Sequence, residues 1–169
     1  MNIFGKLFGH SNSQDIEILE ATIAQLRVGV FARLSQKYIP VFGKQNGELL
    51  SAAILNEALL EGPGNADGEI YRRQNASLIE DESLQVASDP DIATALSYLY
   101  AAQTMYLVYL TQEPLSKRAQ DLGEQAAYLS ISVPNTYDIC GSNDAKECIL
   151  KMGELAAQFL KESKQQMKL

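Results

Sequence analysis

Three consecutive carboxylates, Glu80, Asp81 and Glu82, form the densest group of side chains in the sequence that could do chemistry. Carboxylate oxygens bind divalent cations, and a pair of carboxyl groups can act as general acid and base. Consecutive residues of a helix point in different directions, however, and no second carboxylate group follows at the spacing of a calcium loop. We therefore expect neither a metal site nor a catalytic pair here.

Histidine and cysteine, the usual bases and nucleophiles of hydrolases, are scarce. His10 is the single histidine and stands in a Gly/Ser/Asn-rich stretch near the N-terminus, where little would hold it in place. The two cysteines, Cys140 and Cys148, form no Cys-x-x-Cys pair, and the nearest charged neighbour of Cys140 is Asp138, which would disfavour a reactive thiolate. We predict that the protein is not an enzyme and binds no metal.

The glycine-rich stretch 62–68 is not a phosphate-binding loop. Such a loop needs a lysine and a hydroxyl that enter a helix after a strand, and this stretch has neither. Glycine, proline and asparagine favour turns, so we interpret the stretch as a helix end followed by a turn. No cofactor is predicted.

Several tyrosines between residues 92 and 112 leave a second interpretation open. A tyrosine combines an apolar ring with a polar tip, so a group of them can line a ligand pocket, but core packing explains the same pattern. The tyrosines concerned are Tyr98, Tyr100, Tyr106 and Tyr109.

Helical periodicity accounts for most of the chain. Between Ser11 and Tyr38 apolar residues recur at spacings of three and four, which predicts a helix that stops at Pro40, because proline breaks helix interiors. Further helices are predicted over residues 48–61 with Asn46 as the cap, 67–87, 90–112, 114–130, and from 142–144 to about 164.

The helix predicted over residues 90–112 begins with Asp89 as N-cap and Pro90 in the first helical position. Residues 92–112 carry no charge, so we expect this helix at the centre of the fold. A stretch of this length would also span a bilayer, but its tyrosines are distributed along it and no basic flank fixes an orientation. We predict no stable membrane insertion.

The N-terminal segment 1–12 has a short amphipathic pattern, with Ile3, Phe4, Leu7 and Phe8 beside Lys6. One lysine is few compared with the basic amphipathic helices that bind membranes, so we expect this segment to dock on the domain. The N-terminus has no secretory signal pattern, and we expect a cytoplasmic location.

These patterns predict an all-α protein in which residues 1–169 form a single domain, a bundle or irregular array of about six helices. The longest irregular link is 132–141, which contains Tyr137 and Asp138. Loops of this length are often functional.

The negative charge is concentrated in the middle of the chain. Residues 1–47 hold five basic and three acidic side chains, residues 48–113 hold two and eleven, and residues 114–169 hold seven and seven, so the net charges are +2, −9 and 0. An acidic surface repels nucleic acid and favours encounter with basic proteins. The alternative is a solvated face that only aids solubility.

We therefore expect a non-enzymatic, intracellular protein-binding module of the inhibitor, immunity-protein or adaptor type, with a basic protein partner and no nucleic acid. The alternatives are a helical ligand-binding or regulatory domain with a tyrosine-lined pocket, and an enzyme with an unrecognised site. The residues expected to bind the partner are Glu80, Asp81, Glu82, Glu69, Asp67, Tyr137 and Asp138.

Overall fold

The computed structural model describes residues 12–86, 88–111, 117, 120–121 and 145–166. Within these ranges every regular element is helical and no strand occurs, which confirms the predicted all-α class. Most of the helix predicted over 114–130 and all of the 132–141 link lie outside the described residues. The helices are α2 (Asn12–Phe42), α3 (Lys44–Ala58), α4 (Ala66–Gln74), α5 (Ala76–Val86), α6 (Pro90–Thr111) and α9 (Ala145–Gln166).

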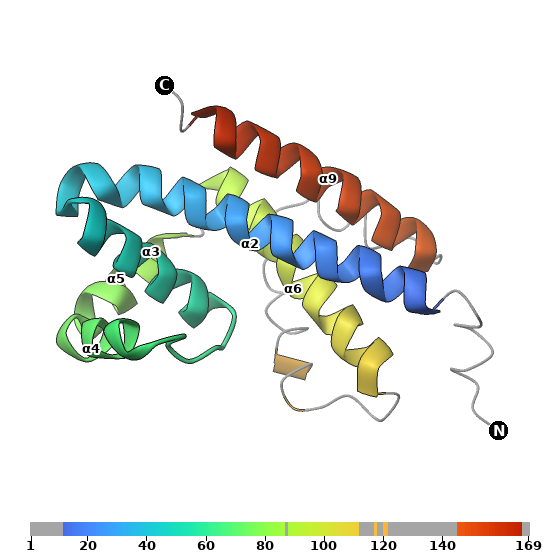
Figure 1. Ribbon diagram of the computed structural model, residues 1–169, viewed down its shortest axis with the longest axis horizontal. Helices are drawn as coiled ribbons and strands as arrows, with labels where there is room; N and C mark the ends of the chain where they lie inside the picture. Colours follow the sequence, from blue (N-terminus) through green and yellow to red (C-terminus); the bar gives the residue numbers. More distant parts are fainter. Residues whose placement is uncertain (1–11, 87, 112–116, 118–119, 122–144, 167–169) are drawn as a thin grey trace.

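Helix α2 is the central element, and α3, α6 and α9 all pack against it (Figure 1). The sequence placed the uncharged α6 at the centre instead, and this prediction was wrong. The first half of α6 is almost entirely buried, but Met105, Tyr106 and Leu107 farther along are only half-buried. An uncharged helix therefore need not be covered on all sides.

Helix α9 runs parallel to α2, as the contacts along the pair show. Gly153 near the start of α9 lies beside Ile18, and Ser163 near its end accepts a 3.0 Å hydrogen bond from Nε of Arg33. The guanidinium of Arg33 also lies 5.4 Å from the centre of the Phe159 ring. These contacts fix the register of α9 along α2.

Helix α6 runs antiparallel to α2. Asp91 in its first turn lies 3.7 Å from the guanidinium of Arg33, whereas the hydroxyl of Tyr106, four turns later, donates a 2.9 Å hydrogen bond to Glu20. Its start is as predicted, because Oδ1 of Asp89 accepts hydrogen bonds from the backbone N–H groups of Asp91 and Ile92.

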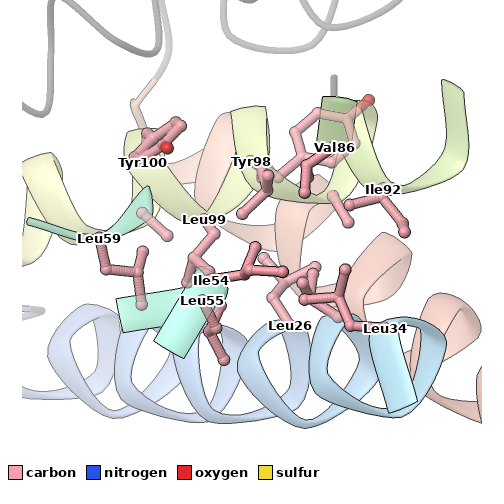
Figure 2. Packing of buried hydrophobic residues seen from close by; sticks show 14 of the residues in the cluster. Leu26, Leu34, Ile54, Leu55, Leu59, Val86, Ile92, Tyr98, Leu99 and Tyr100 are labelled. Carbon is pink, nitrogen blue, oxygen red and sulfur yellow. The ribbon is translucent and has the colours of Figure 1, made fainter. Parts of the chain in front are cut away.

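The core lies where side chains of α2, α3, α5, α6 and α9 meet, and Figure 2 shows part of it. Leu99 of α6 and Leu50 of α3 are completely buried, and full burial of such a leucine contributes about 1.5 to 3 kcal/mol. Other members of this cluster are Leu26, Leu34, Ile54, Leu55, Val86, Ile92 and Tyr98.

Pro40 does not end the first helix, contrary to the prediction. Helix α2 continues to Phe42, whose ring packs 6.2 Å from that of Tyr38. Pro40 is exposed and falls in the last turn, so it removes one backbone hydrogen bond at an end that tertiary packing already holds. The helix ends at Gly43 instead, whose φ of 80° lies in the left-handed region that glycine favours.

This glycine also starts α3, four residues earlier than predicted. Gly43 occupies the N-cap position and no side chain caps the helix, so Asn46, the predicted cap, lies inside the first turn. Gly47 then lets the two helices approach closely, because a Cβ there would come within 2.7 Å of the backbone of Ile39. The connection between α2 and α3 is consequently a single residue.

The helix predicted over 67–87 is two helices, α4 and α5, separated at Asn75. The backbone of Asn75 leaves the helical region, with φ −125° and ψ 27°, and its side-chain N–H donates a 3.0 Å hydrogen bond to the carbonyl of Tyr71. Asparagine side chains compete in this way with the helical backbone. Tyr71 and Ile79 are buried and Leu78 is half-buried.

The last predicted helix corresponds to α9. In the described part of the chain no helix combines the length and apolar character needed to cross a bilayer.

Candidate functional site

Helices α4 and α5 carry five of the seven residues predicted to bind a partner, and they lie together at one side of the fold (Figure 1). The side chain of Asn65 caps α4 by accepting a 2.8 Å hydrogen bond from the N–H of Gly68. Helix α5 packs against α3 through its apolar side, where Ile79 and Val86 are 3% and 5% exposed. The opposite side of α5 therefore faces solvent.

Glu80 and Asp81 lie on this solvent side and are both exposed. Neither carboxylate forms an ion pair with any described residue. Because adjacent helix positions differ by about 100°, the two side chains diverge but share the outward half of the helix. They present two negative charges directly to water.

Glu82 faces the opposite way, toward α2. Its Oε2 accepts a 2.7 Å hydrogen bond from the hydroxyl of Tyr38 and lies 3.3 Å from Nζ of Lys37. Burial, and next the hydrogen bond to Glu82, raise the pKa of Tyr38. The three consecutive carboxylates are thus divided, with two directed to solvent and one that attaches α5 to α2.

Two further predicted residues lie in α4. Glu69 forms an ion pair with Arg73 one turn later, whereas Asp67 is exposed in the first turn, where a negative charge interacts favourably with the helix dipole. Asp67 has no ion pair with a described residue.

Ion pairs neutralise about half of the acidic middle segment. Three of the cations come from the basic first segment, and all three belong to α2. The pairs are Arg27–Glu61, Arg33–Asp91, Lys37–Glu82, Arg72–Glu57 and Arg73–Glu69. Three of these pairs join two helices, namely Arg33–Asp91, Lys37–Glu82 and Arg72–Glu57.

The Arg27–Glu61 pair is the best formed of these contacts. Nη1 and Nη2 of Arg27 donate to Oε1 and Oε2 of Glu61, at 3.0 and 2.9 Å, and the two side chains are 32% and 26% exposed. A bidentate, half-buried pair fixes geometry better than an exposed one. It holds the end of α3 against α2, so the charge of Glu61 is not available to a partner.

Leu84 was not among the predicted site residues, yet it stands next to the unpaired carboxylates. It is 77% exposed, one turn after Glu80 on the outer side of α5. The sequence alone does not distinguish Leu84 from Leu78 and Ile79, because all three are apolar residues of the same helix. Only the bounds of α5 and its buried side show that Leu84 is the exposed one. It is the most exposed of the large apolar side chains in the described part of the chain.

Most of the other predicted residues are either outside the described part of the chain or buried in the core. Tyr137 and Asp138 lie outside the described residues, as do His10 and Cys140. Tyr98 and Tyr100 are 4% and 5% exposed within the hydrophobic cluster, and burial raises the pKa of Tyr100 to about 12. Cys148 is buried in the same cluster, and no group of three or more metal-ligating side chains gathers within the described ranges.

No family model, curated protein or solved structure matches this chain. Its function is therefore inferred from the geometry of the α4–α5 surface.

Proposed function

We propose that the chain is a non-enzymatic protein-binding module that uses the outer side of α4 and α5 to bind a basic protein. One observation carries the proposal. Glu80 and Asp81 are exposed with no ion pair to a described residue, while Glu82 beside them is held by Tyr38 and Lys37. Of the five described residues that were predicted to bind a partner, Glu80, Asp81 and Asp67 therefore form no ion pair with a described residue.

The attachment of α5 supports a binding role. Helix α5 is fixed on its inner side by Ile79 and Val86 in the core and by the Tyr38–Glu82 hydrogen bond. The outward carboxylates consequently stand on a rigid element and lose little conformational freedom when a partner binds. A preorganised charged surface gains both encounter rate and specificity.

The sign of the charge selects the class of partner. Nucleic acids and anionic membranes bind through basic residues that meet phosphate groups, so two unpaired carboxylates oppose both. A cationic protein surface supplies the complementary lysines and arginines. An inhibitor or adaptor that acts on a basic protein needs such an exposed acidic surface to meet these lysines and arginines.

The test is affinity capture by the immobilised full-length chain from its native cell extract, in parallel with the double variant Glu80→Lys/Asp81→Lys. We expect a basic protein to be retained by the wild-type chain and lost by the variant. The control is Glu17→Lys/Glu154→Lys, which reverses two exposed carboxylates on α2 and α9 and gives the same change in net charge.

Retention of the same basic protein by the wild type and the control, but not by the α5 variant, supports the proposal. Equal retention by all three proteins would contradict it, because binding would then not depend on α5. Circular dichroism of each variant checks that the helical content is unchanged.

A further inference from the structure

The outer side of α5 carries one exposed leucine as well as two charges. Glu80 and Asp81 lie four and three residues before Leu84, the spacings at which helix side chains are neighbours. We call these three residues the α5 outer face. Unlike a solvated acidic helix, this face offers a partner an apolar contact as well as negative charge.

Leu84 has no visible role in holding the fold. Leu84 is 77% exposed. Helix α5 packs on the core through Ile79 and Val86, and Glu82 attaches the helix to α2. A single exposed leucine is common on protein surfaces. Here, however, it lies one turn after two exposed carboxylates that form no ion pair with a described residue, so an apolar side chain and two negative charges share one side of the helix.

We infer that Leu84 is the anchor of the binding surface and that its partner presents an apolar recess bordered by lysine or arginine side chains. This inference rests on the proposed function and names the partner chemistry of the same surface. Glu80 and Asp81 form the charged rim, which acts on the association rate and the salt dependence. Leu84 enters the recess and acts on the dissociation rate.

Charge complementarity argues against the other occupants of this face. A two-fold dimer through this face would bring the Glu80 and Asp81 carboxylates of both copies into one interface, and their like charges would repel. A lipid surface would meet the leucine but carries the wrong charge at its headgroups. A basic protein with an exposed apolar groove satisfies both features of the face.

The probe for the test is a synthetic amphipathic helix built only of leucine and lysine, titrated into the full-length protein and followed by backbone amide shifts in NMR. The matched probes are polylysine, which has the charge without the apolar face, and a leucine/glutamate helix, which has the apolar face with the opposite charge. The variants are Leu84→Ala, Glu80→Lys/Asp81→Lys, and Leu150→Ala as the control. Leu150 is a 54% exposed leucine on α9.

The inference predicts shifts centred on residues 80–84 with the leucine/lysine helix, and none with the leucine/glutamate helix. Leu84→Ala should weaken binding by at least about fivefold, the loss expected for an interface anchor worth more than about 1 kcal/mol, whereas Leu150→Ala should leave it unchanged. The double charge variant should weaken binding and flatten its salt dependence.

Two results would overturn the inference, and they are distinguishable. If polylysine binds as tightly as the leucine/lysine helix and Leu84→Ala changes nothing while the charge variant loses binding, the anchor is wrong but the acidic binding surface stands. If neither the leucine nor the charge variant changes binding, the inference and the proposed function both fail.

Discussion

The hydroxyl of Tyr38 in α2 donates a 2.7 Å hydrogen bond to Oε2 of Glu82 in α5, and this contact joins the central helix to the element that carries the candidate surface. Tyr38 is only 2% exposed, so its hydroxyl has little access to water as an alternative partner. Glu82 therefore acts within the fold, although it is adjacent to two carboxylates that face solvent.

The first prediction follows from this division. Glu82→Ala leaves the buried hydroxyl of Tyr38 without its acceptor, and we expect the free energy of unfolding to fall by about 1 to 3 kcal/mol. Glu80→Ala should change it by less than about 0.5 kcal/mol, as is usual for exposed positions. Urea denaturation of both variants measures the difference. Equal effects would show that the Tyr38–Glu82 contact does not stabilise the protein.

The second prediction concerns glycines at helix contacts. In Gly47→Ala the new Cβ would lie 2.7 Å from backbone atoms of Ile39, which cannot move aside without separating α2 and α3. We expect this overpacking to cost about 1 to 3 kcal/mol of unfolding free energy. The matched control is Gly153→Ala, where the nearest atoms of Ile18 and Thr22 are 3.5 Å away.

At Gly153 the added methyl group meets only ordinary van der Waals contact, and alanine restricts the unfolded chain. We therefore expect Gly153→Ala to stabilise the protein by about 0.4 to 1 kcal/mol, as at other unstrained helix positions. Thermal unfolding of the two variants should show shifts of opposite sign. Stabilisation by both substitutions would contradict the close approach of α2 and α3.

The third prediction concerns alkaline pH. Burial raises the pKa of Tyr100 to about 12, and burial with the Glu82 hydrogen bond raises that of Tyr38. Tyrosine in the unfolded chain titrates near pH 10, so the unfolded chain loses these protons first as the pH rises. The stability that is present below pH 10 is therefore lost progressively as the pH rises toward the folded-state pKa values.

Urea denaturation between about pH 9 and 11.5 measures this loss, which amounts to at most about 1.4 kcal/mol per pH unit for each tyrosine that stays protonated. Tyr100→Phe removes one of the titrating groups and should make the decline shallower. An unchanged decline in that variant would exclude Tyr100 as a contributor.

The fourth prediction tests the core. Leu99 of α6 is completely buried among the side chains shown in Figure 2, and Leu99→Ala should cost about 2 to 5 kcal/mol of unfolding free energy. Leu107 farther along α6 is half-buried, so Leu107→Ala should cost less. Chemical denaturation ranks the two variants. The reverse order would place the centre of the core near the end of α6.

Local patterns predicted the helical class and most of the helices, because helix caps and apolar spacing involve residues only a few positions apart. Asp89 and Pro90 marked the start of α6 correctly for this reason. At two positions the local pattern predicted the helix bounds wrongly: a helix end was predicted at Pro40, and a continuous helix was predicted through Asn75. Helix α2 continues beyond Pro40, where the rings of Tyr38 and Phe42 pack together. The helix predicted over 67–87 is interrupted at Asn75, whose side chain donates a hydrogen bond to the carbonyl of Tyr71.

The candidate surface was predictable only in part, because its composition depends on contacts between distant residues. The sequence identified the acidic segment, but Arg27 and Glu61 are 34 positions apart and nothing local indicated their pairing. Likewise, only the fold shows that Glu82 belongs with Tyr38 and that Leu84 belongs with Glu80 and Asp81.

If Glu80 and Asp81 on α5 meet a basic protein, the association rate with the captured partner should depend on these two carboxylates and on ionic strength. The wild-type chain and the Glu17→Lys/Glu154→Lys control should associate with similar rates that fall as salt rises. Glu80→Lys/Asp81→Lys should associate at least about tenfold more slowly at low salt, with a flatter salt dependence, because the local charges steer encounter. An α5 variant that associates like the control at every salt concentration would contradict the claim.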